Sequence, residues 1–366
     1  MNEQNPTIYK NKSRRAKATS DKDDDQIILT TRARIARNIA GFRFGSINNE
    51  TERKEILNLV KNTFFSLSRN KGYNFYTMNK LSKTQRKLLV ERHLISYEMT
   101  LKLSGKGFIL RGDSSEMGKA ISIMINEEDH LRIQSIIPGL NIYRSYNEVM
   151  KIEKDLEKKL NFSYDKNFGY LTACPTNLGT SLRISVIVHL PAIVVSSKVE
   201  DFIKKLSKIN CTIRGYFGEN SEVLCNLFQI ANQVSLGKYE DQIIDEMNAI
   251  CLNIIDEEKN AKDFLRQNKQ ENVEDSIFRS YGMLKYAKML SFGESLELLS
   301  MLRLGLDIDV IKNIKPFDFY NLIGILGDSN ILASYGKNIK LKSEDVDKIR
   351  ASLIRERILK GFDENV

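Results

Sequence analysis

A cluster of charged side chains interrupts an otherwise apolar run in this sequence, and it constrains the fold more than any other feature. The run Asn126–Arg132 contains three acids, a histidine and an arginine. Strand-forming residues precede it from Ala120 and continue after it at Ile133. Buried charge costs free energy unless it is paired or used. The cluster is therefore interpreted either as a solvated turn or as a functional site that interrupts a mostly buried sheet.

The composition is that of a globular protein with a hydrophobic core. The chain has 366 residues, of which 42% are hydrophobic and 28% are charged. No apolar run reaches the roughly 18 residues that span a bilayer. The polar amino terminus also lacks the apolar stretch of a signal peptide. We therefore expect no membrane association and a cytoplasmic location.

The cysteines and histidines form no recognisable metal site. None of the four cysteines belongs to a Cys-x-x-Cys pair, and the three histidines are far apart in sequence. Neither a histidine-based metal centre nor a disulfide framework is expected. The cysteines are Cys174, Cys211, Cys225 and Cys251, and the histidines are His93, His130 and His189.

The net charge of +9 is compatible with two kinds of partner, nucleic acid or an anionic small molecule such as ATP. The basic run Lys10–Lys17 is interpreted as part of a solvated, flexible tail over residues 1–24. Elsewhere the basic residues alternate with acids along predicted helices and form no groove-binding stripe. Direct binding of nucleic acid is therefore not expected.

The hydrophobic pattern changes along the chain from short strands to regular helices. After about residue 238 nearly every segment has helical spacing. The pattern predicts an α+β catalytic core over residues 25–258 and an all-helical domain over residues 259–366. The predicted strands are residues 26–34, 108–111, 121–125, 170–172, 184–190, 211–214 and 228–235, and the predicted helices of the core are residues 50–70, 80–100 and 151–160.

Five arginines lie at strand ends, beside glycines, acids or conformational breaks. Arg32 and Arg34 are two residues apart on one predicted strand and therefore share a face. Each alone is typical of a surface arginine, but the set is better explained as convergent. A guanidinium binds phosphate oxygens through two parallel hydrogen bonds, and a triphosphate with Mg²⁺ would offset the mutual repulsion of the cluster. The other three are Arg132, Arg183 and Arg214.

Two loops carry further reactive groups. In residues 172–183 the Cys174 thiol, several hydroxyls and the Asn177 amide precede a strand. A neighbouring hydroxyl can stabilise a thiolate, although a buried structural cysteine is the commoner case. In residues 214–222 two glycines permit mobility, and Glu219 would arrive on a loop able to close over a substrate.

Three motifs together resemble the ATP:guanido phosphotransferase (phosphagen kinase) superfamily, which includes creatine kinase and arginine kinase. They are NEEDHLR at 126–132, CPTNLGT at 174–180 and the Arg-Gly loop at 214–219. The resemblance extends over nearly the whole chain and implies a core with a mainly antiparallel sheet flanked by helices. Residues 278–282, 303–307 and 353–357 are most similar to a bacterial branch that phosphorylates arginine side chains of proteins.

The resemblance implies a role for each part of the site. Glu128 would be the catalytic base, with Glu127 beside it, and Glu219 would be the second guanidinium-binding carboxylate. Cys174 and Asn177 would orient the guanidinium. ATP and Mg²⁺ would be required, with the metal held by ATP and water and not by protein ligands. The implied nucleotide contacts are Thr30, Thr31, Arg32, Ala33, Arg34, His93, Arg132, Arg183, Ile184, Ser185, Val186, Ile187, Arg214, Gly215, Tyr216, Phe217, Gly218 and Glu219.

The sequence departs from the family pattern at three places. The family's Thr-Gly before a phosphate-binding arginine is Thr180-Ser181 here, and its Thr-Ser-Cys is Thr172-Ala173-Cys174. A phosphoarginine-binding motif, Arg-Asp-x-x-Arg-Ala, aligns with Val346–Ala351. That segment keeps Asp347 and Arg350, which would bind phosphoarginine, but has valine in place of the first arginine.

The resemblance also implies a biological role, the marking of proteins for Clp-type proteolysis in a stress response. Metabolic phosphagen kinases carry a helical domain before the core, whereas here the core begins near residue 26, which should leave the site open to an arginine on a protein. Expected partners are protein substrates with exposed arginines, a second copy bound through the C-terminal domain, a Clp-type chaperone, a heat-shock repressor and a zinc-binding activator. The alternatives are a small-molecule guanidino kinase and a catalytically silent adaptor or DNA-associated regulator.

Overall fold

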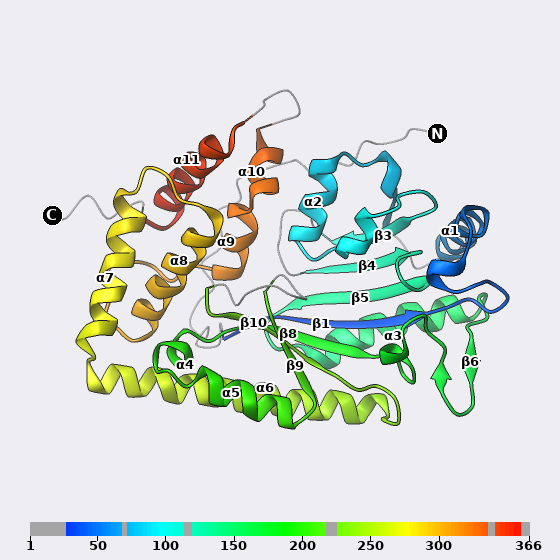
Figure 1. Cartoon of the computed structure of the whole chain (residues 1–366), viewed down its shortest axis with the longest axis horizontal. Helices are drawn as coiled ribbons and strands as arrows, with labels where there is room; N and C mark the ends of the chain where they lie inside the picture. Colours follow the sequence, from blue (N-terminus) through cyan, green and yellow to red (C-terminus); the bar gives the residue numbers. More distant parts are fainter. Residues whose placement is uncertain (1–26, 68–71, 113–118, 217–224, 336–340, 360–366) are drawn as a thin grey trace.

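An eight-stranded antiparallel sheet forms the centre of the molecule (Figure 1). The computed structural model describes residues 27–67, 72–112, 119–216, 225–335 and 341–359. The strand order is β2-β3-β4-β5-β1-β8-β10-β9, and every neighbouring pair runs antiparallel, which confirms the predicted fold class. The strands are β1 Ile28–Arg37, β2 Asn74–Thr77, β3 Gly107–Gly112, β4 Ala120–Ile125, β5 Leu131–Pro138, β8 Arg183–His189, β9 Cys211–Gly215 and β10 Leu227–Asn232, with a separate hairpin of β6 Tyr164–Asp165 and β7 Gly169–Tyr170.

The acidic run is the turn of the hairpin between β4 and β5. All six residues of β4 are buried, and β5 is buried up to its last residue, as expected for β-branched residues in the middle of a sheet. Asn126 has a φ of 60°, and its N–H donates to the His130 carbonyl at 3.0 Å, which closes the turn. The prediction that the acids interrupt a buried sheet is confirmed.

Helices cover both sides of the sheet unequally. One face packs against α1 Glu50–Phe65, α3 Ile142–Glu157 and α6 Glu240–Asn268. The other face is covered by α2 Lys83–Glu91 only over β3 and β4, in a smaller apolar cluster. The remaining helices are α4 Pro191–Val195, α5 Val199–Lys208, α7 Glu271–Tyr286, α8 Phe292–Asp307, α9 Phe319–Leu326, α10 Asp328–Ser334 and α11 Ser343–Ile354.

Alternation along β1 gives the sheet an apolar face and a charged face. Ala33 and Ile35 are buried in the core, whereas Arg32 and Arg34 are only partly buried and project to the other side. Because β1 lies at the centre of the sheet, its arginines lie between strands on both sides. The charged face is therefore the place where a site can form.

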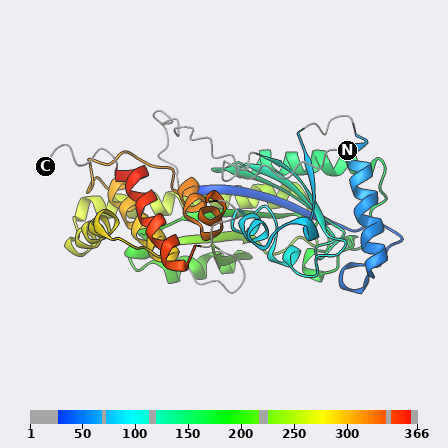
Figure 2. The same ribbon diagram turned by 90° about the horizontal axis from the view of Figure 1, so that it is seen from above.

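The C-terminal helices gather at one end of the sheet. Figure 1 shows α7 to α11 at the end nearest α4, and Figure 2 shows them on the opposite side of the molecule from α1. They dock on α2, where the Glu91 carboxylate accepts hydrogen bonds from the N–H and hydroxyl of Ser329, the latter at 2.7 Å. The helix α6 runs unbroken through residues 258 and 259, so the domain division at that point stays a prediction. None of the described helices is long and apolar enough to cross a membrane.

Most predicted elements overlap observed ones, with four differences. The helix expected at 151–160 begins at Ile142, and the strand expected at 170–172 ends at Tyr170. The segment 80–100 is one short helix, α2, followed by turns. The edge strand β2, which has only four residues, was not predicted. The tail at 1–24 lies outside the described residues.

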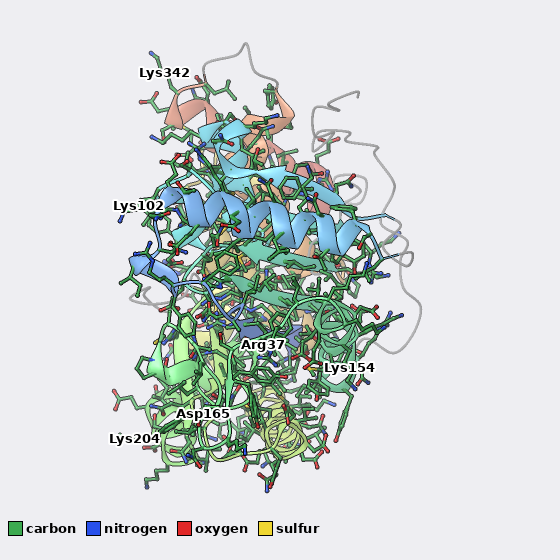
Figure 3. All side chains as sticks on the ribbon, turned by 90° about the vertical axis from the view of Figure 1, so that its right-hand side faces the viewer. Arg37, Lys102, Lys154, Asp165, Lys204 and Lys342 are labelled. Atoms are coloured by element: carbon green, nitrogen blue, oxygen red, sulfur yellow. The ribbon has the colours of Figure 1, made fainter. Side chains whose placement is uncertain are left out.

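A buried ion pair joins the end of β1 to α3. Arg37 is fully buried, its Nε donates to Glu153 at 2.7 Å, and its guanidinium lies 3.4 Å from the Tyr170 ring centroid. Figure 3 shows Arg37 inside the molecule, in contrast to the surface residue Lys154 on α3. Both charges are therefore removed from water, and each is compensated by the opposite charge of its partner.

Removing one partner should destabilise the fold. We expect Glu153→Ala to lower the free energy of unfolding by about 3–5 kcal/mol, because it leaves a buried, uncompensated guanidinium. Replacing Asp155, which pairs with Lys158 at the surface, by alanine is the matched control and should cost less than about 1 kcal/mol. Urea unfolding measures both, and equal losses would contradict the assignment.

Candidate functional site

The strand register places all five arginines on one face of the sheet. Arg34 lies directly opposite Arg183 on β8, and residues directly opposite each other share a face. The same alternation puts Arg32 and Arg132 on that side, on β1 and β5. Arg214 reaches it from the edge strand, through Gln229 and Ile187. The convergence predicted from the sequence agrees with this register.

The arginines of this face lower one another's pKa values. Burial and the neighbouring Arg132 and Arg183 lower the pKa of Arg32 to about 10. Burial, Arg132, Arg32 and Arg183 also hold the pKa of Arg34 well below its usual value. Arg32 Nε donates to the neutral Ser185 hydroxyl at 3.2 Å. A polyanion would relieve this repulsion, so the donors fit a triphosphate.

A small cavity opens beside Arg32. Its volume is about 10 Å³, which is close to the space of one water molecule. His93 contributes a buried Nε2 that has no hydrogen-bond partner among the described residues. Burial, followed by the charge of Arg32, lowers the pKa of His93 to about 3, so the ring is neutral. The cavity is lined by Thr30, Arg32, His93, Ile136, Ser185, Ile187, Gln229 and Tyr320.

Glu127 is fully engaged in holding an arginine. Its Oε1 lies 2.6 Å from Nη1 of Arg132 and accepts a hydrogen bond from the Ser96 hydroxyl at 2.7 Å. Its Oε2 accepts the N–H of Glu128 at 3.0 Å. The side chain is only 1% exposed. Glu127 therefore lies beside Glu128, as expected, but its two oxygens are already used.

Glu128 is the accessible carboxylate of the turn. Its side chain is 43% exposed, and its Oε2 lies 3.6 Å from Nη2 of Arg132. Burial raises the pKa of Glu128, and the charge of Arg132 opposes that rise. Of the two adjacent glutamates, Glu128 is the one that can meet an incoming basic group.

A buried network joins the acidic turn to the cysteine loop. Oδ1 of Asp129 accepts hydrogen bonds from the Asn38 amide at 2.7 Å and from the N–H of Ala173 at 2.6 Å. A Cβ placed on Gly45 would lie 2.5 Å from the Glu128 carbonyl oxygen and 3.1 Å from Cβ of Ala173. Three segments distant in sequence therefore meet where Glu128 and the cysteine loop approach each other.

The cysteine loop presents its thiol at the surface of this junction. Cys174 is partly exposed, and its Sγ lies 3.0 Å from the Thr176 hydroxyl, the contact expected from the sequence. Asn177 ends the same short turn, and its N–H donates to the Cys174 carbonyl at 3.0 Å. Phe217, Gly218 and Glu219 lie outside the described residues.

The remaining implied contacts are divided between the two faces of the sheet. Four side chains point to the opposite, apolar face; they belong to Thr31, Ala33, Ile184 and Val186. Gly215 is paired with Phe228 on β10, and Tyr216 packs edge-on against His93 with ring centroids 5.0 Å apart. Only the backbone of the first four is near the arginines.

Arg350 is committed to the interior of the helical domain. It is fully buried, and it donates to the carbonyls of Leu326 at 2.9 Å and Leu290 at 2.7 Å. It also forms ion pairs with Asp347 and Asp328. Arg350 therefore joins α11 to the α9–α10 corner.

The sequence pattern does not single out several residues that complete the site. Tyr320 comes from the helical domain, is 5% exposed, and lies against Thr30 and Arg32. Asn38 and Gly45 act only through contacts with residues more than 80 positions away. Of these three residues, only Gly45 could have been noticed from its residue type, since glycine is favoured where the backbone has a positive φ, here 43°.

Comparison with known proteins agrees with this geometry. Residues 55–261 match the family described as ATP:guanido phosphotransferase, C-terminal catalytic domain, and residues 270–365 match the protein-arginine kinase McsB C-terminal domain. The chain is 37% identical to a protein-arginine kinase of Desulforamulus reducens over 343 residues, which cover 92% of this chain and 93% of that protein. A protein-arginine kinase of Bacillus cereus is 37% identical over 340 residues, covering 92% and 94%.

Solved structures show the same core. The duplicated taurocyamine kinase of Schistosoma mansoni, with bound transition-state analogue components, aligns with a TM-score of 0.57 and 26% identity. The alignment covers 64% of this chain and spans only 33% of that larger chain. Lombricine kinase aligns with a TM-score of 0.55 and 25% identity, covering 63% of this chain and 66% of that one.

Ser181 adopts a backbone conformation that favours glycine. Its φ is 56°, and its buried hydroxyl accepts the N–H of Ala36 at 2.9 Å. We expect Ser181→Ala to lower the free energy of unfolding by about 1–3 kcal/mol, because a buried N–H loses its partner. Ser181→Gly loses the same bond but relieves about 1–2 kcal/mol of left-handed strain, so it should be the milder change. Urea unfolding ranks the two, and a stable alanine variant would contradict the role of the hydroxyl.

Proposed function

The chain belongs to the ATP:guanido phosphotransferase family, and on that premise we propose that it transfers the γ-phosphoryl group of ATP to arginine side chains of proteins. One observation carries the proposal: an accessible carboxylate, Glu128, lies beside a sheet face that presents five arginines. Relatives of nearly equal length from Desulforamulus reducens and Bacillus cereus are protein-arginine kinases, which supports a protein as the substrate.

The charged face would hold the nucleotide. Arg32, Arg34 and Arg183 lie on adjacent strands, with Arg132 and Arg214 on either side, so their guanidinium groups can surround a chain of phosphates. His93 would contact the uncharged part of ATP, because its neutral imidazole nitrogen has no hydrogen-bond partner among the described residues. Mg²⁺ bound to the triphosphate would neutralise charge on the transferring group.

Glu128 would remove the proton that makes the substrate a poor nucleophile. An arginine side chain is protonated, with a pKa above about 12. As the N–P bond forms and the bond from phosphorus to the ADP oxygen breaks, one guanidinium proton passes to the Glu128 carboxylate. Cys174 and Asn177 would orient the guanidinium, and Glu219 would be the second carboxylate that binds it. Glu127 would act indirectly, because it fixes Arg132.

The wider role extends the same proposal. We include cytoplasmic marking of proteins for Clp-type proteolysis, a homodimer formed through the helical domain, a heat-shock repressor as substrate and a zinc-binding activator, all on the strength of the family resemblance. Phosphoarginine binding at Asp347 and Arg350 would require the Arg350 guanidinium to exchange its bonds to the Leu326 and Leu290 carbonyls for a phosphoryl group.

Replacing the proposed base tests the chemistry. We expect Glu128→Gln to lower kcat by about 10²–10⁴-fold, because the amide cannot accept the proton. Glu55→Gln, which changes an exposed acid on α1, is the matched control and should leave kcat unchanged. The measurement is phosphoarginine formed on an unfolded protein. Near-full activity of Glu128→Gln would remove the assignment.

The pH profile gives an independent test of Glu128. A general base works only when deprotonated, so kcat/KM should fall as pH drops through its pKa. Because burial raises that pKa, the acidic limb should lie at a higher pH than an ordinary glutamate would give. The residual activity of Glu128→Gln should lack this limb. If kcat/KM of the native protein stays constant down to the pH at which an ordinary glutamate is protonated, Glu128 is not the general base.

A further inference from the structure

Three large apolar side chains are exposed around the acidic turn. Ile47 is 69% exposed, Tyr97 is 64% exposed and Leu101 is 48% exposed. They come from two short helical turns, Gly45–Ile47 and Tyr97–Thr100, and from the residue that follows the second. Single exposed apolar residues are ordinary, but these three lie on segments that contact the acidic turn. We call them the apolar rim.

The Ile47 turn touches the proposed base directly. Gly45 lies two residues before Ile47, and a Cβ at Gly45 would come 2.5 Å from the carbonyl oxygen of Glu128. Two residues of chain span at most about 7 Å. Ile47 is therefore held close to the backbone of the catalytic turn.

The other two members of the rim are tied to the same turn through their neighbours. Tyr97 follows Ser96, whose hydroxyl donates to Glu127 at 2.7 Å. The loop after Leu101 returns to the turn at Gly105, whose carbonyl accepts the Asn126 amide at 2.7 Å. Lys102, the residue next to Leu101, lies at the edge of the molecule beside α1 (Figure 3).

The rim is in reach of the residues that flank a bound arginine. In an extended polypeptide each residue advances about 3.3 Å. Residues one to three positions from an arginine held at Glu128 therefore lie roughly 3–10 Å along the chain from it, and the contacts of Gly45 and Ser96 hold the rim segments near the same turn. Both the Glu128 carboxylate and the apolar side chains of the rim are exposed to solvent, so one bound segment could contact both.

We propose that the apolar rim binds apolar side chains flanking the target arginine in an extended protein segment. This inference rests on the proposed function and narrows its substrate class. An arginine with apolar neighbours is mostly buried with them in a folded protein, so such segments become available when a protein unfolds. The rim thus selects unfolded chains without recognising a particular sequence.

Two peptides test the proposal. Both carry a single arginine and have equal length and net charge; one has leucines and the other serines at the flanking positions. The native chain should phosphorylate the leucine peptide with the lower KM. Each of Ile47→Ser, Tyr97→Ser and Leu101→Ser should raise that KM about three- to tenfold, because each removes part of the apolar contact. The KM for the serine peptide and both kcat values should stay unchanged.

Ile209→Ser is the matched control, because Ile209 is 49% exposed beyond α5, away from the acidic turn. It should leave the KM for both peptides unchanged. Equal KM values for the two peptides in the native chain, or an unaltered preference in the triple rim variant, would overturn the proposal. A rim variant that changes the oligomeric state in sedimentation would also overturn it, since the rim would then be an interface between copies.

Direct binding separates this inference from the proposed function. Fluorescence anisotropy of the labelled peptides, measured without ATP, reports the contact even where no phosphoryl transfer occurs. Absence of transfer to either peptide would end the proposed function, whereas tighter binding of the leucine peptide, lost in the rim variants, would still support the rim. Equal binding of both peptides would contradict the role of the apolar rim but not the proposed function.

Discussion

Repulsion among like charges on one sheet face is the constraint on which the rest of this structure depends. Antiparallel register forces Arg34 and Arg183 to face each other, with Arg32 and Arg132 nearby. Glu127 is engaged with Arg132, and Arg32 donates to the neutral hydroxyl of Ser185. A protein keeps such a cluster only at a cost in stability, so the cluster indicates an anionic ligand. The triphosphate of ATP has the matching charge.

The site also requires a carboxylate near this positive charge that is not fully occupied by an ion pair with the arginines. The structure meets this requirement by giving the two glutamates different surroundings. Glu127 is buried against Arg132, while Glu128 is turned toward solvent. Asp129, which binds the Ala173 N–H, then fixes the turn against the cysteine loop. Phosphoryl transfer to a guanidinium needs this arrangement, because the base and the phosphates must approach one nitrogen together.

The sequence predicted the parts of the site that depend on local pattern. The hairpin around Asn126–Arg132 followed from apolar runs on both sides of the acids, and the shared face of Arg32 and Arg34 followed from strand alternation. The chain-distant contacts of Asn38 and Tyr320 could not be predicted, because they arise where separate elements pack. The early start of α3 was missed although Asn141 is a typical N-cap residue, because most of the first residues of the helix, IYRSYN, have only modest helix propensity. Glu219 lies in a segment outside the described residues.

The most direct measurement of the central claim is the chemical nature of the product. Purified full-length chain, ATP labelled in the γ position and an unfolded protein would be incubated, and the label would be characterised by its acid stability and by mass spectrometry. We expect an acid-labile N–P bond on arginine side chains, formed in preference to phosphorylation of free L-arginine. Label found only on hydroxyl groups, or only on free arginine, would contradict it.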